Sequence, residues 1–157
     1  MIRIGHAWDT HKVFPNRKLI LGGVLIDYPL GLLGHSDADV VLHAVAESFL
    51  GALALGDLGT FFPDNSEKTL NIDSKIILKE CYKKVLDLGY HLNNLDLTIY
   101  SQNVRIAPVR EAIQESIARI LDVDKSLVSI KATTWEKMGF IGEGLALACE
   151  CVCLVEK

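Results

Sequence analysis

The amino-acid sequence predicts an α+β fold, a two-layer sandwich in which a mixed four-stranded sheet carries helices on one face and an N-terminal hairpin is added. Two observations predict this fold. Segments of alternating apolar and polar residues are interspersed with segments whose apolar residues recur at helical spacing. Half of the 157 residues are hydrophobic and 23% are charged, which suffices for one core but not for two domains of ordinary size. We therefore expect one domain over residues 1–157.

The expected strands begin at the N-terminus with residues 2–8. Residues 18–21 and 24–27 flank two consecutive glycines, which are a strong signal for a two-residue hairpin because both positions accept positive φ. The strands that complete the sheet are expected at 95–101, 127–132 and 145–155.

Three helices separate these strands. The first is expected to begin near residues 37–39, where acidic side chains suit the positive end of a helix, and to end near Leu55. The second is expected over residues 74–88 with Ser74 as its cap. The third begins near Pro108, because a proline in the first turn has no N–H to leave unbonded. With every helix on one face, the other face of the sheet needs cover, and association of several copies is one way to supply it.

Charge and composition exclude several classes of function. The net charge is −4, with 16 basic and 20 acidic residues, so nothing supports a nucleic-acid partner or an anionic membrane surface. No apolar run approaches the roughly 20 residues that span a bilayer, and no basic region followed by an apolar one opens the sequence, so we expect a cytoplasmic protein. Cys149, Cys151 and Cys153 alternate along one strand, which favours buried apolar side chains over a three-thiolate metal site.

Four of the five histidines fall within the first 43 residues, which indicates that a catalytic or metal-binding site lies in this part of the chain. Asp9 and His11 are two residues apart, so in an extended chain they point to the same side. His43, on the first long helix, can add a third ligand. Two imidazoles and a carboxylate suit a catalytic zinc ion whose fourth position stays open. Spacing alone leaves open the alternative of a surface Asp9–His11 pair beside a hydrogen-bonded core histidine.

Two further segments are rich in polar groups. Residues 35–39 (His-Ser-Asp-Ala-Asp) precede the first long helix, where backbone N–H groups and the helix dipole can meet an anion, and Asp39 lies four residues before His43. Residues 131–140 place two threonine hydroxyls beside Glu136, a carboxylate able to hold magnesium. The alternatives are an ordinary acidic helix start and an exposed polar turn.

Taken together and in order, these segments resemble the 2-C-methyl-D-erythritol 2,4-cyclodiphosphate synthase family. The resemblance covers essentially the whole chain, and only the combination of motifs is highly specific. Its motifs are Arg3-Ile4-Gly5-His6 with Asp9-Thr10-His11, Leu21-Gly22-Gly23-Val24, Gly31–Val40, Leu42-His43-Ala44, Leu53–Leu58, Phe62-Pro63-Asp64, Lys131-Ala132-Thr133-Thr134 and Glu136–Phe140.

The resemblance assigns roles to individual residues. Asp9, His11 and His43 match zinc ligands, and Glu136 matches the ligand of a magnesium or manganese ion on the substrate diphosphate. His35 and Thr134 match catalytic residues that stabilise the transition state. It also implies substrate-binding residues: Ser36 beside the phosphates, Phe140, and Asp57, Leu58 and Gly59 on the methylerythritol hydroxyls. It implies a substrate loop formed by Phe62, Pro63, Asp64, Asn65 and Ser66. It further implies that the adjacent subunit supplies a cytidine pocket formed by Ser101, Gln102, Asn103, Val104, Arg105, Ile106, Ala107, Ala132, Thr133 and Trp135.

The resemblance also implies an activity and an assembly. The family cyclises 4-diphosphocytidyl-2-C-methyl-D-erythritol 2-phosphate and releases CMP in the non-mevalonate isoprenoid pathway, as a homotrimer with zinc and a second divalent cation. Such cations explain how an acidic protein binds an anionic substrate. The sequence departs from the family at Trp135, where Thr or Asn is usual, and at Arg105, where Lys is common. Two rival functions use the same residues: a zinc-dependent phosphohydrolase that admits water, and a non-catalytic nucleotide- or metal-binding trimer.

Overall fold

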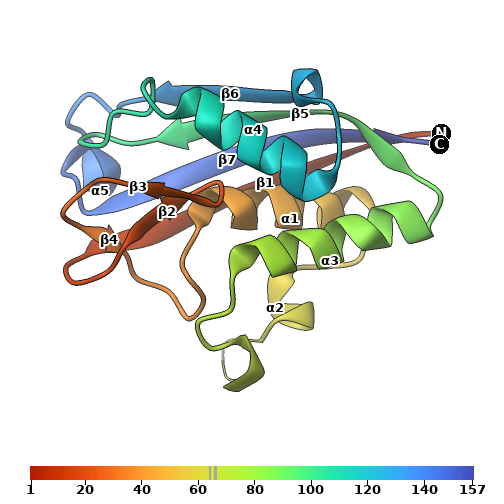
Figure 1. Ribbon diagram of the computed structural model, residues 1–157, viewed down its shortest axis with the longest axis horizontal. Helices are drawn as coiled ribbons and strands as arrows, with labels where there is room; N and C mark the ends of the chain where they lie inside the picture. The colour runs from red at the N-terminus through yellow and green to blue at the C-terminus, as the bar shows by residue number, and fades with distance from the viewer. Residues whose placement is uncertain (64, 66) are drawn as a thin grey trace.

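A computed structural model describes residues 1–63, 65 and 67–157 of the chain. One layer is a five-stranded mixed sheet of order β4-β1-β7-β5-β6 (Figure 1). β1 (Ile2–Phe14) and β7 (Ala146–Glu156) are its long antiparallel pair, in register from Ile2 opposite Glu156 to Lys12 opposite Ala146. The chain ends meet at one end of this pair, where the N-terminal amine donates to the Lys157 carbonyl.

The remaining strands extend the sheet on both sides. β5 (His91–Tyr100) runs antiparallel to β7, and β6 (Val128–Thr133) runs parallel to β5. β4 (Gly31–Leu32) pairs with the end of β1. The sheet therefore has five strands where the sequence predicts four. Two residues are too few to show an alternating pattern, and β4 finds a partner only because β1 continues to Phe14.

The hairpin of β2 (Leu19–Leu21) and β3 (Val24–Ile26) forms where it is predicted, as a separate two-stranded sheet. Both turn glycines have positive φ, 61° at Gly22 and 77° at Gly23. A Cβ added at Gly22 would lie 2.4 Å from Cγ2 of Ile113. The first glycine therefore serves both the turn and its close approach to the helix that carries Ile113.

The helices form the second layer, on one face of the sheet (Figure 1). The three long helices confirm the predicted ones, and α1 packs on β1 and β7, α3 on α1, and α4 on β6 and α3. The short helices were not predicted, because a single turn shows no periodicity. The long helices are α1 (Val40–Ala52), α3 (Ser74–Asp87) and α4 (Arg110–Leu121), and the short ones are α2 (Leu58–Phe61), α5 (Gly139–Gly142), η1 (Glu67–Thr69) and η2 (Lys125–Leu127).

Close contacts between α1 and the sheet explain why several positions of β1 and β7 are occupied by small residues. A Cβ added at Gly5 of β1 would lie 1.8 Å from the Ser48 carbonyl oxygen of α1, so only glycine allows this approach. Cys149, Cys151 and Cys153 of β7 face the same interior and are fully buried free thiols, as the sequence predicts. Burial raises the pKa of each thiol, so all three stay protonated at neutral pH.

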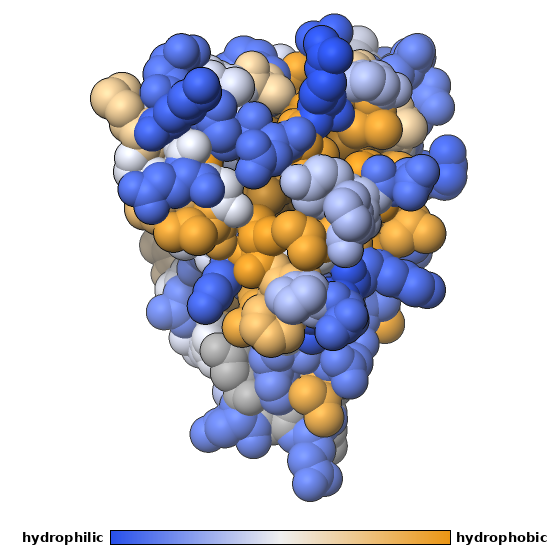
Figure 2. Space-filling model, turned by 90° about the vertical axis from the view of Figure 1, so that its left-hand side faces the viewer, coloured by the Kyte–Doolittle hydropathy of each residue, from blue (hydrophilic) through white to orange (hydrophobic). Residues whose placement is uncertain are grey.

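The opposite face of the sheet is open and mixes apolar with polar side chains. Ile4 is 67% exposed and Val152 43% exposed. Nε2 of His6 lies 2.8 Å from Oε1 of Glu150, whose other oxygen accepts a 2.6 Å hydrogen bond from the Tyr100 hydroxyl. The end of the molecule that carries α5 and β4 also shows apolar side chains among charged ones (Figure 2). Exposed apolar residues of these segments are Phe14, Leu33, Met138, Phe140 and Leu145.

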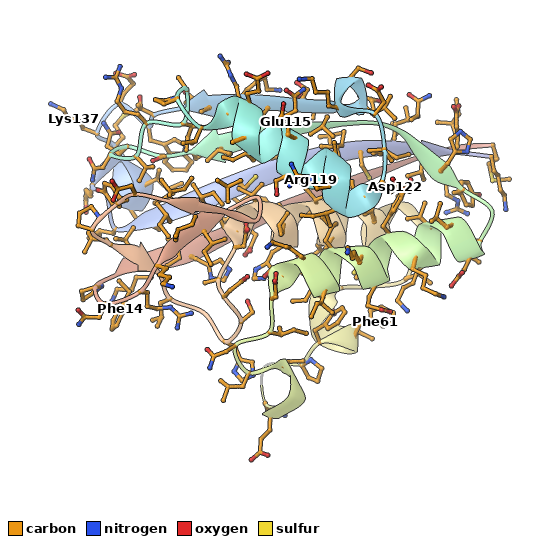
Figure 3. All side chains as sticks on the ribbon, viewed as in Figure 1. Phe14, Phe61, Glu115, Arg119, Asp122 and Lys137 are labelled. Carbon is orange, nitrogen blue, oxygen red and sulfur yellow. The ribbon has the colours of Figure 1, made fainter. Side chains whose placement is uncertain are left out.

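The outer surface of the helical layer is polar. Glu115 and Arg119 lie along the solvent side of α4, and Asp122 follows its last turn in a left-handed conformation with φ of 56° (Figure 3). No helix within residues 1–63, 65 and 67–157 is both long and apolar enough to cross a bilayer.

Asp39 fastens the hairpin to α1. Its buried carboxylate accepts four hydrogen bonds from backbone N–H groups: Gly22 and Gly23 of the hairpin at 2.9 and 2.6 Å, and Val41 and Leu42 in the first turn of α1, both at 3.1 Å. The Asp39 carbonyl accepts a hydrogen bond from the His43 N–H at 3.0 Å. Asp39 is thus the helix cap and a tertiary link together.

Replacing Asp39 by alanine should lower the free energy of unfolding by about 3 kcal/mol or more, because it leaves several buried N–H groups without an acceptor. Asp73→Ala is the matched control, since Asp73 is the exposed cap of α3 and accepts a hydrogen bond from the Lys75 N–H. That change should cost about 1 kcal/mol. Urea unfolding of both variants measures the difference, and equal losses would contradict the tertiary role of Asp39.

Candidate metal centre and substrate cavities

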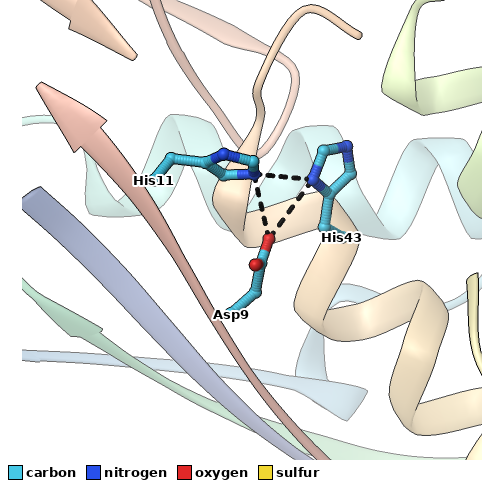
Figure 4. Close-up of side chains that lie close together, drawn as sticks. All are labelled: Asp9, His11 and His43. Carbon is cyan, nitrogen blue, oxygen red and sulfur yellow. Dashed lines mark hydrogen bonds and ion pairs between the residues drawn. The ribbon is translucent and has the colours of Figure 1, made fainter. Parts of the chain in front are cut away.

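Three side chains converge where β1 passes under the first turns of α1 (Figure 4). Asp9 and His11 lie on the face of β1 that meets α1, because they are two residues apart on an extended strand. His43 comes from α1. Nε2 of His11 lies 3.0 Å from Nδ1 of His43 and 3.1 Å from Oδ2 of Asp9, and Nδ1 of His43 lies 3.2 Å from the same oxygen. The three side chains therefore form one cluster, in which Asp9 lies within ion-pair distance of both histidines.

The other nitrogen of His11 fixes which form of the ring faces the cluster. Nδ1 lies 3.0 Å from the Leu33 carbonyl oxygen, which can only accept a hydrogen bond. Nδ1 therefore carries the proton, and in the neutral ring Nε2 presents a lone pair to Asp9 and His43. Metal-binding histidines commonly donate their second N–H to a carbonyl in this way.

The electrostatics of the cluster favour a negative Asp9. Burial raises the pKa of the Asp9 carboxyl, but the hydrogen bonds and positive charge that His11 and His43 supply when these rings are protonated outweigh burial and hold the pKa well below its usual range. Burial lowers the pKa of His11, but the hydrogen bond and charge of Asp9 outweigh it, so the pKa of His11 is raised. A cation at this point, whether a proton or a metal, is therefore stabilised.

The three atoms fit a divalent metal ion. Zinc binds histidine nitrogen and carboxylate oxygen at about 2.0–2.2 Å in tetrahedral sites, which places neighbouring ligand atoms roughly 3.3 Å apart. The observed separations of 3.0, 3.1 and 3.2 Å come close to this spacing. Three protein ligands leave one position for water or substrate, which is typical of a catalytic ion.

The cluster forms one wall of a cavity of about 470 Å³. His35 and Ser36, from the segment before α1, line it together with Leu58, Gly59 and Phe62, which the sequence also predicts. Asp57 is the exposed cap of α2 and accepts hydrogen bonds from both the N–H and the hydroxyl of Thr60. Pro63 and Asn65 are exposed, and Asp64 and Ser66 lie outside the described residues.

A second cavity, of about 260 Å³, lies at the end of β6. It gathers most of the residues predicted for cytidine, since the Ser101 N–H donates to the Thr133 carbonyl and the Ser101 hydroxyl accepts from the Val104 N–H. Asn103 and Trp135, which are also predicted for cytidine, do not line it. The lining residues are Ser101, Gln102, Val104, Arg105, Ile106, Ala107, Ala132, Thr133 and Thr134.

The turn after β6 carries the remaining predicted residues. The Thr134 hydroxyl donates to Oε1 of Glu136 at 2.9 Å, and Glu136 has a φ of 50°, which is uncommon outside glycine. The Trp135 and Phe140 rings pack with their centroids 5.8 Å apart. Thr134 and Glu136 are not among the residues that line the first cavity, so one chain holds the two groups of predicted residues in separate places.

Sequence reasoning missed several residues of the first cavity. Glu47 lines it one helical turn after His43, a spacing that could have identified it. Burial raises the pKa of the Glu47 carboxyl. Thr69, Ile72 and Ile77 also line the cavity but belong to segments distant in sequence, and they give no local signal.

Known proteins resemble this chain over nearly its whole length. The model of the YgbB family matches residues 2–156. The 2-C-methyl-D-erythritol 2,4-cyclodiphosphate synthase of Clostridium acetobutylicum is 47% identical over 98% of this chain and 99% of its own length, and that of Carboxydothermus hydrogenoformans is 50% identical over 93% and 91%.

Solved structures share the fold. The bifunctional IspDF of Campylobacter jejuni superposes with a TM-score of 0.95 at 38% identity, covering 99% of this chain and 42% of that one. The CDP complex of IspF from Plasmodium falciparum superposes with a TM-score of 0.87 at 36% identity, covering 98% and 95%. By sequence over nearly its whole length and by fold, the chain belongs to the YgbB family, whose relatives here are 2-C-methyl-D-erythritol 2,4-cyclodiphosphate synthases.

Proposed function

We propose that the chain is a metal-dependent lyase that converts 4-diphosphocytidyl-2-C-methyl-D-erythritol 2-phosphate to 2-C-methyl-D-erythritol 2,4-cyclodiphosphate and CMP in isoprenoid biosynthesis. An oxygen of the 2-phosphate attacks the β-phosphorus. The bond from the β-phosphorus to the oxygen that bridges the diphosphate breaks, and CMP leaves with that oxygen. The observation that carries the proposal is the convergence of Asp9, His11 and His43 on the wall of a cavity of about 470 Å³.

The reaction depends more on how the protein positions the two reacting phosphorus groups than on proton transfer. The attacking phosphate is already ionised, so proximity and neutralisation of charge lower the barrier. Zinc, when bound, supplies a Lewis acid that polarises phosphate oxygens. Ser36 and His35 line the cavity and can donate hydrogen bonds to the phosphate groups. Together with Thr134, His35 is proposed to stabilise the transition state.

Two metal sites are proposed. The nitrogen and oxygen donors of Asp9, His11 and His43 suit zinc. Glu136, an exposed carboxylate that a turn with positive φ holds beside Thr134, offers only oxygen and suits magnesium or manganese on the diphosphate. The loop at 101–107 is linked to this turn, because the Lys137 N–H donates to Oε1 of Gln102 at 3.2 Å.

The functional unit is proposed to be a homotrimer of single-domain subunits, residues 1–157, in the cytoplasm. Its active sites would lie between neighbouring subunits, so that the cytidine cavity of one chain completes the metal-centre cavity of the next. Two observations support this arrangement: the two cavities of one chain share no lining residue, and the sheet presents exposed apolar side chains. Asp57, Leu58 and Gly59 are proposed to bind the hydroxyls of the methylerythritol unit.

A substrate analogue without the 2-phosphate tests the proposed cyclisation. The metal-loaded protein should release CMP from the full substrate, and not from 4-diphosphocytidyl-2-C-methyl-D-erythritol, because the analogue lacks the nucleophile. A phosphohydrolase that uses water would release CMP from both. A binding protein would release CMP from neither.

Zinc binding should weaken as the pH falls. His11 must lose its proton before Nε2 can bind a metal, and its pKa is raised in the metal-free protein, so protons compete with zinc at a higher pH than they would at an ordinary histidine. Below the pKa of His11, each pH unit should lower the affinity by about tenfold for each proton displaced. Competition with a chelator at pH 8, 7 and 6 measures this, and an affinity independent of pH would contradict the assignment of His11.

A further inference from the structure

The His43 ring is within hydrogen-bond distance of two serine side chains from other segments, on the side away from the metal centre. Nε2, the nitrogen that faces away from the metal centre, lies 2.9 Å from the Ser74 hydroxyl at the start of α3 and 3.1 Å from the Ser36 hydroxyl. Ser74 is fully buried. The sequence predicts Ser74 as the cap of α3, but Asp73 is the cap and accepts from the Lys75 N–H, which leaves the Ser74 hydroxyl to reach His43.

The Asp37 carboxylate is hydrogen-bonded to Ser74, which also contacts His43. The Ser74 hydroxyl donates to Oδ1 of Asp37, and the Ser74 N–H donates to Oδ2 at 3.0 Å. Both carboxylate oxygens of Asp37 therefore accept hydrogen bonds from Ser74. Asp37 is itself fixed in the segment before α1, because Oδ1 also accepts from the Asp39 N–H at 3.2 Å and the Asp37 N–H donates to the Ile72 carbonyl. The contacts connect α3 to the segment that precedes α1.

The positions of the protons follow from the donor and acceptor capacity of each group. A carboxylate only accepts, so the single hydroxyl proton of Ser74 goes to Asp37. The Ser74 oxygen can then only accept from His43, which requires a proton on Nε2. In the neutral ring this leaves Nδ1 with a lone pair, aimed at Asp9 and His11.

We propose that Ser74 and Asp37 are positioning residues that fix His43 in the form and orientation that binds the metal. This inference goes beyond the proposed function by adding residues to it, and it rests on the metal centre of that function. The chain of hydrogen bonds runs from Nε2 of His43 through the Ser74 hydroxyl to the Asp37 carboxylate. Such partners behind a ligand orient the ring and raise its basicity, and their loss typically costs 10- to 100-fold in metal affinity.

The donors and acceptors around Ser36 give this residue a different role. Its hydroxyl oxygen accepts from the Ala38 N–H at 3.1 Å, and Nε2 of His43 cannot accept a proton because it already carries one. The Ser36 hydroxyl proton is therefore available to the cavity that Ser36 lines. Ser36 can donate to a bound phosphate while Ser74 holds the histidine.

Zinc affinity and the His43 N–H resonance test the proposal without reference to activity. Ser74→Ala and Asp37→Asn should each lower zinc affinity by about 10- to 100-fold in competition with a chelator. In the zinc-loaded protein, NMR with ¹⁵N-labelled histidine should show a hydrogen-bonded Nε2–H on His43 that exchanges faster with water in both variants. Ser74→Thr keeps the hydroxyl and should restore most of the affinity.

The matched control is Ser48→Ala. Ser48 is equally buried but donates to the Val45 carbonyl and lies 3.3 Å from Sγ of Cys151, away from His43. This variant should match the unmodified protein in zinc affinity within about twofold. Wild-type affinity in Ser74→Ala and Asp37→Asn, or a zinc-loaded His43 without a proton on Nε2, would overturn the positioning role while the metal centre stands. Failure of the unmodified protein to bind zinc would overturn both.

Discussion

His43→Ala is expected to lose most bound zinc and to lower the rate of cyclisation by more than about a hundredfold, since the loss of even an indirect partner of a metal ligand costs 10- to 100-fold. His43 is one of the three proposed metal ligands, and the other two, Asp9 and His11, lie on a single strand. Most of the core does not depend on the ring, because nine of the ten buried residues of α1 are apolar. The variant should therefore stay folded.

Metal analysis and circular dichroism of the same sample separate these effects. His91→Ala is the matched control, since His91 is an exposed histidine at the start of β5, 3.5 Å from Glu156. It should keep full zinc content and activity. Full zinc occupancy in His43→Ala would show that the metal binds elsewhere.

A mixture of two inactive variants should recover activity, because each proposed site combines cavities from neighbouring subunits. Light scattering should first report about three times 17.3 kDa. His43→Ala disables the metal-centre cavity, and Ala132→Trp fills the cavity at the end of β6, which Ala132 lines. When the two variants are mixed equally and reassembled, about one quarter of the interfaces receive two intact halves. The mixture should approach that fraction of the unmodified activity.

The control mixture contains His43→Ala and His11→Ala. Both changes lie in the same cavity, so no arrangement of the two subunits produces an intact site and activity should stay absent. Activity in neither mixture, or a fully active monomer, would contradict a site shared between subunits.

Local patterns predicted the long elements and the residues of the metal centre. Gly22-Gly23 predicted the hairpin because both turn positions need positive φ. Acidic residues at its start predicted α1, and helical spacing of apolar residues predicted α3 and α4, each to within a few residues. Asp9 and His11 could be paired because a strand places alternate residues on one face. His43 joined them only as a hypothesis, since its distance from β1 depends on how α1 crosses the sheet.

The rest depends on packing between distant segments. β4 has two residues, and α2 and α5 have four each, so none of them shows a period. Ser74 is a plausible cap in sequence, and its contact with His43 exists only because α3 packs on α1. The separation of the two cavities likewise follows from where β6 lies in the sheet, which no single motif records.

Phosphorus NMR of a reaction run in ¹⁸O-labelled water tests the central claim most directly. The metal-loaded protein, given 4-diphosphocytidyl-2-C-methyl-D-erythritol 2-phosphate, should produce CMP and a cyclic diphosphate without ¹⁸O, because the attacking oxygen comes from the substrate's own 2-phosphate. A linear product that carries ¹⁸O on its β-phosphorus would show that water is the nucleophile, and would contradict the cyclisation.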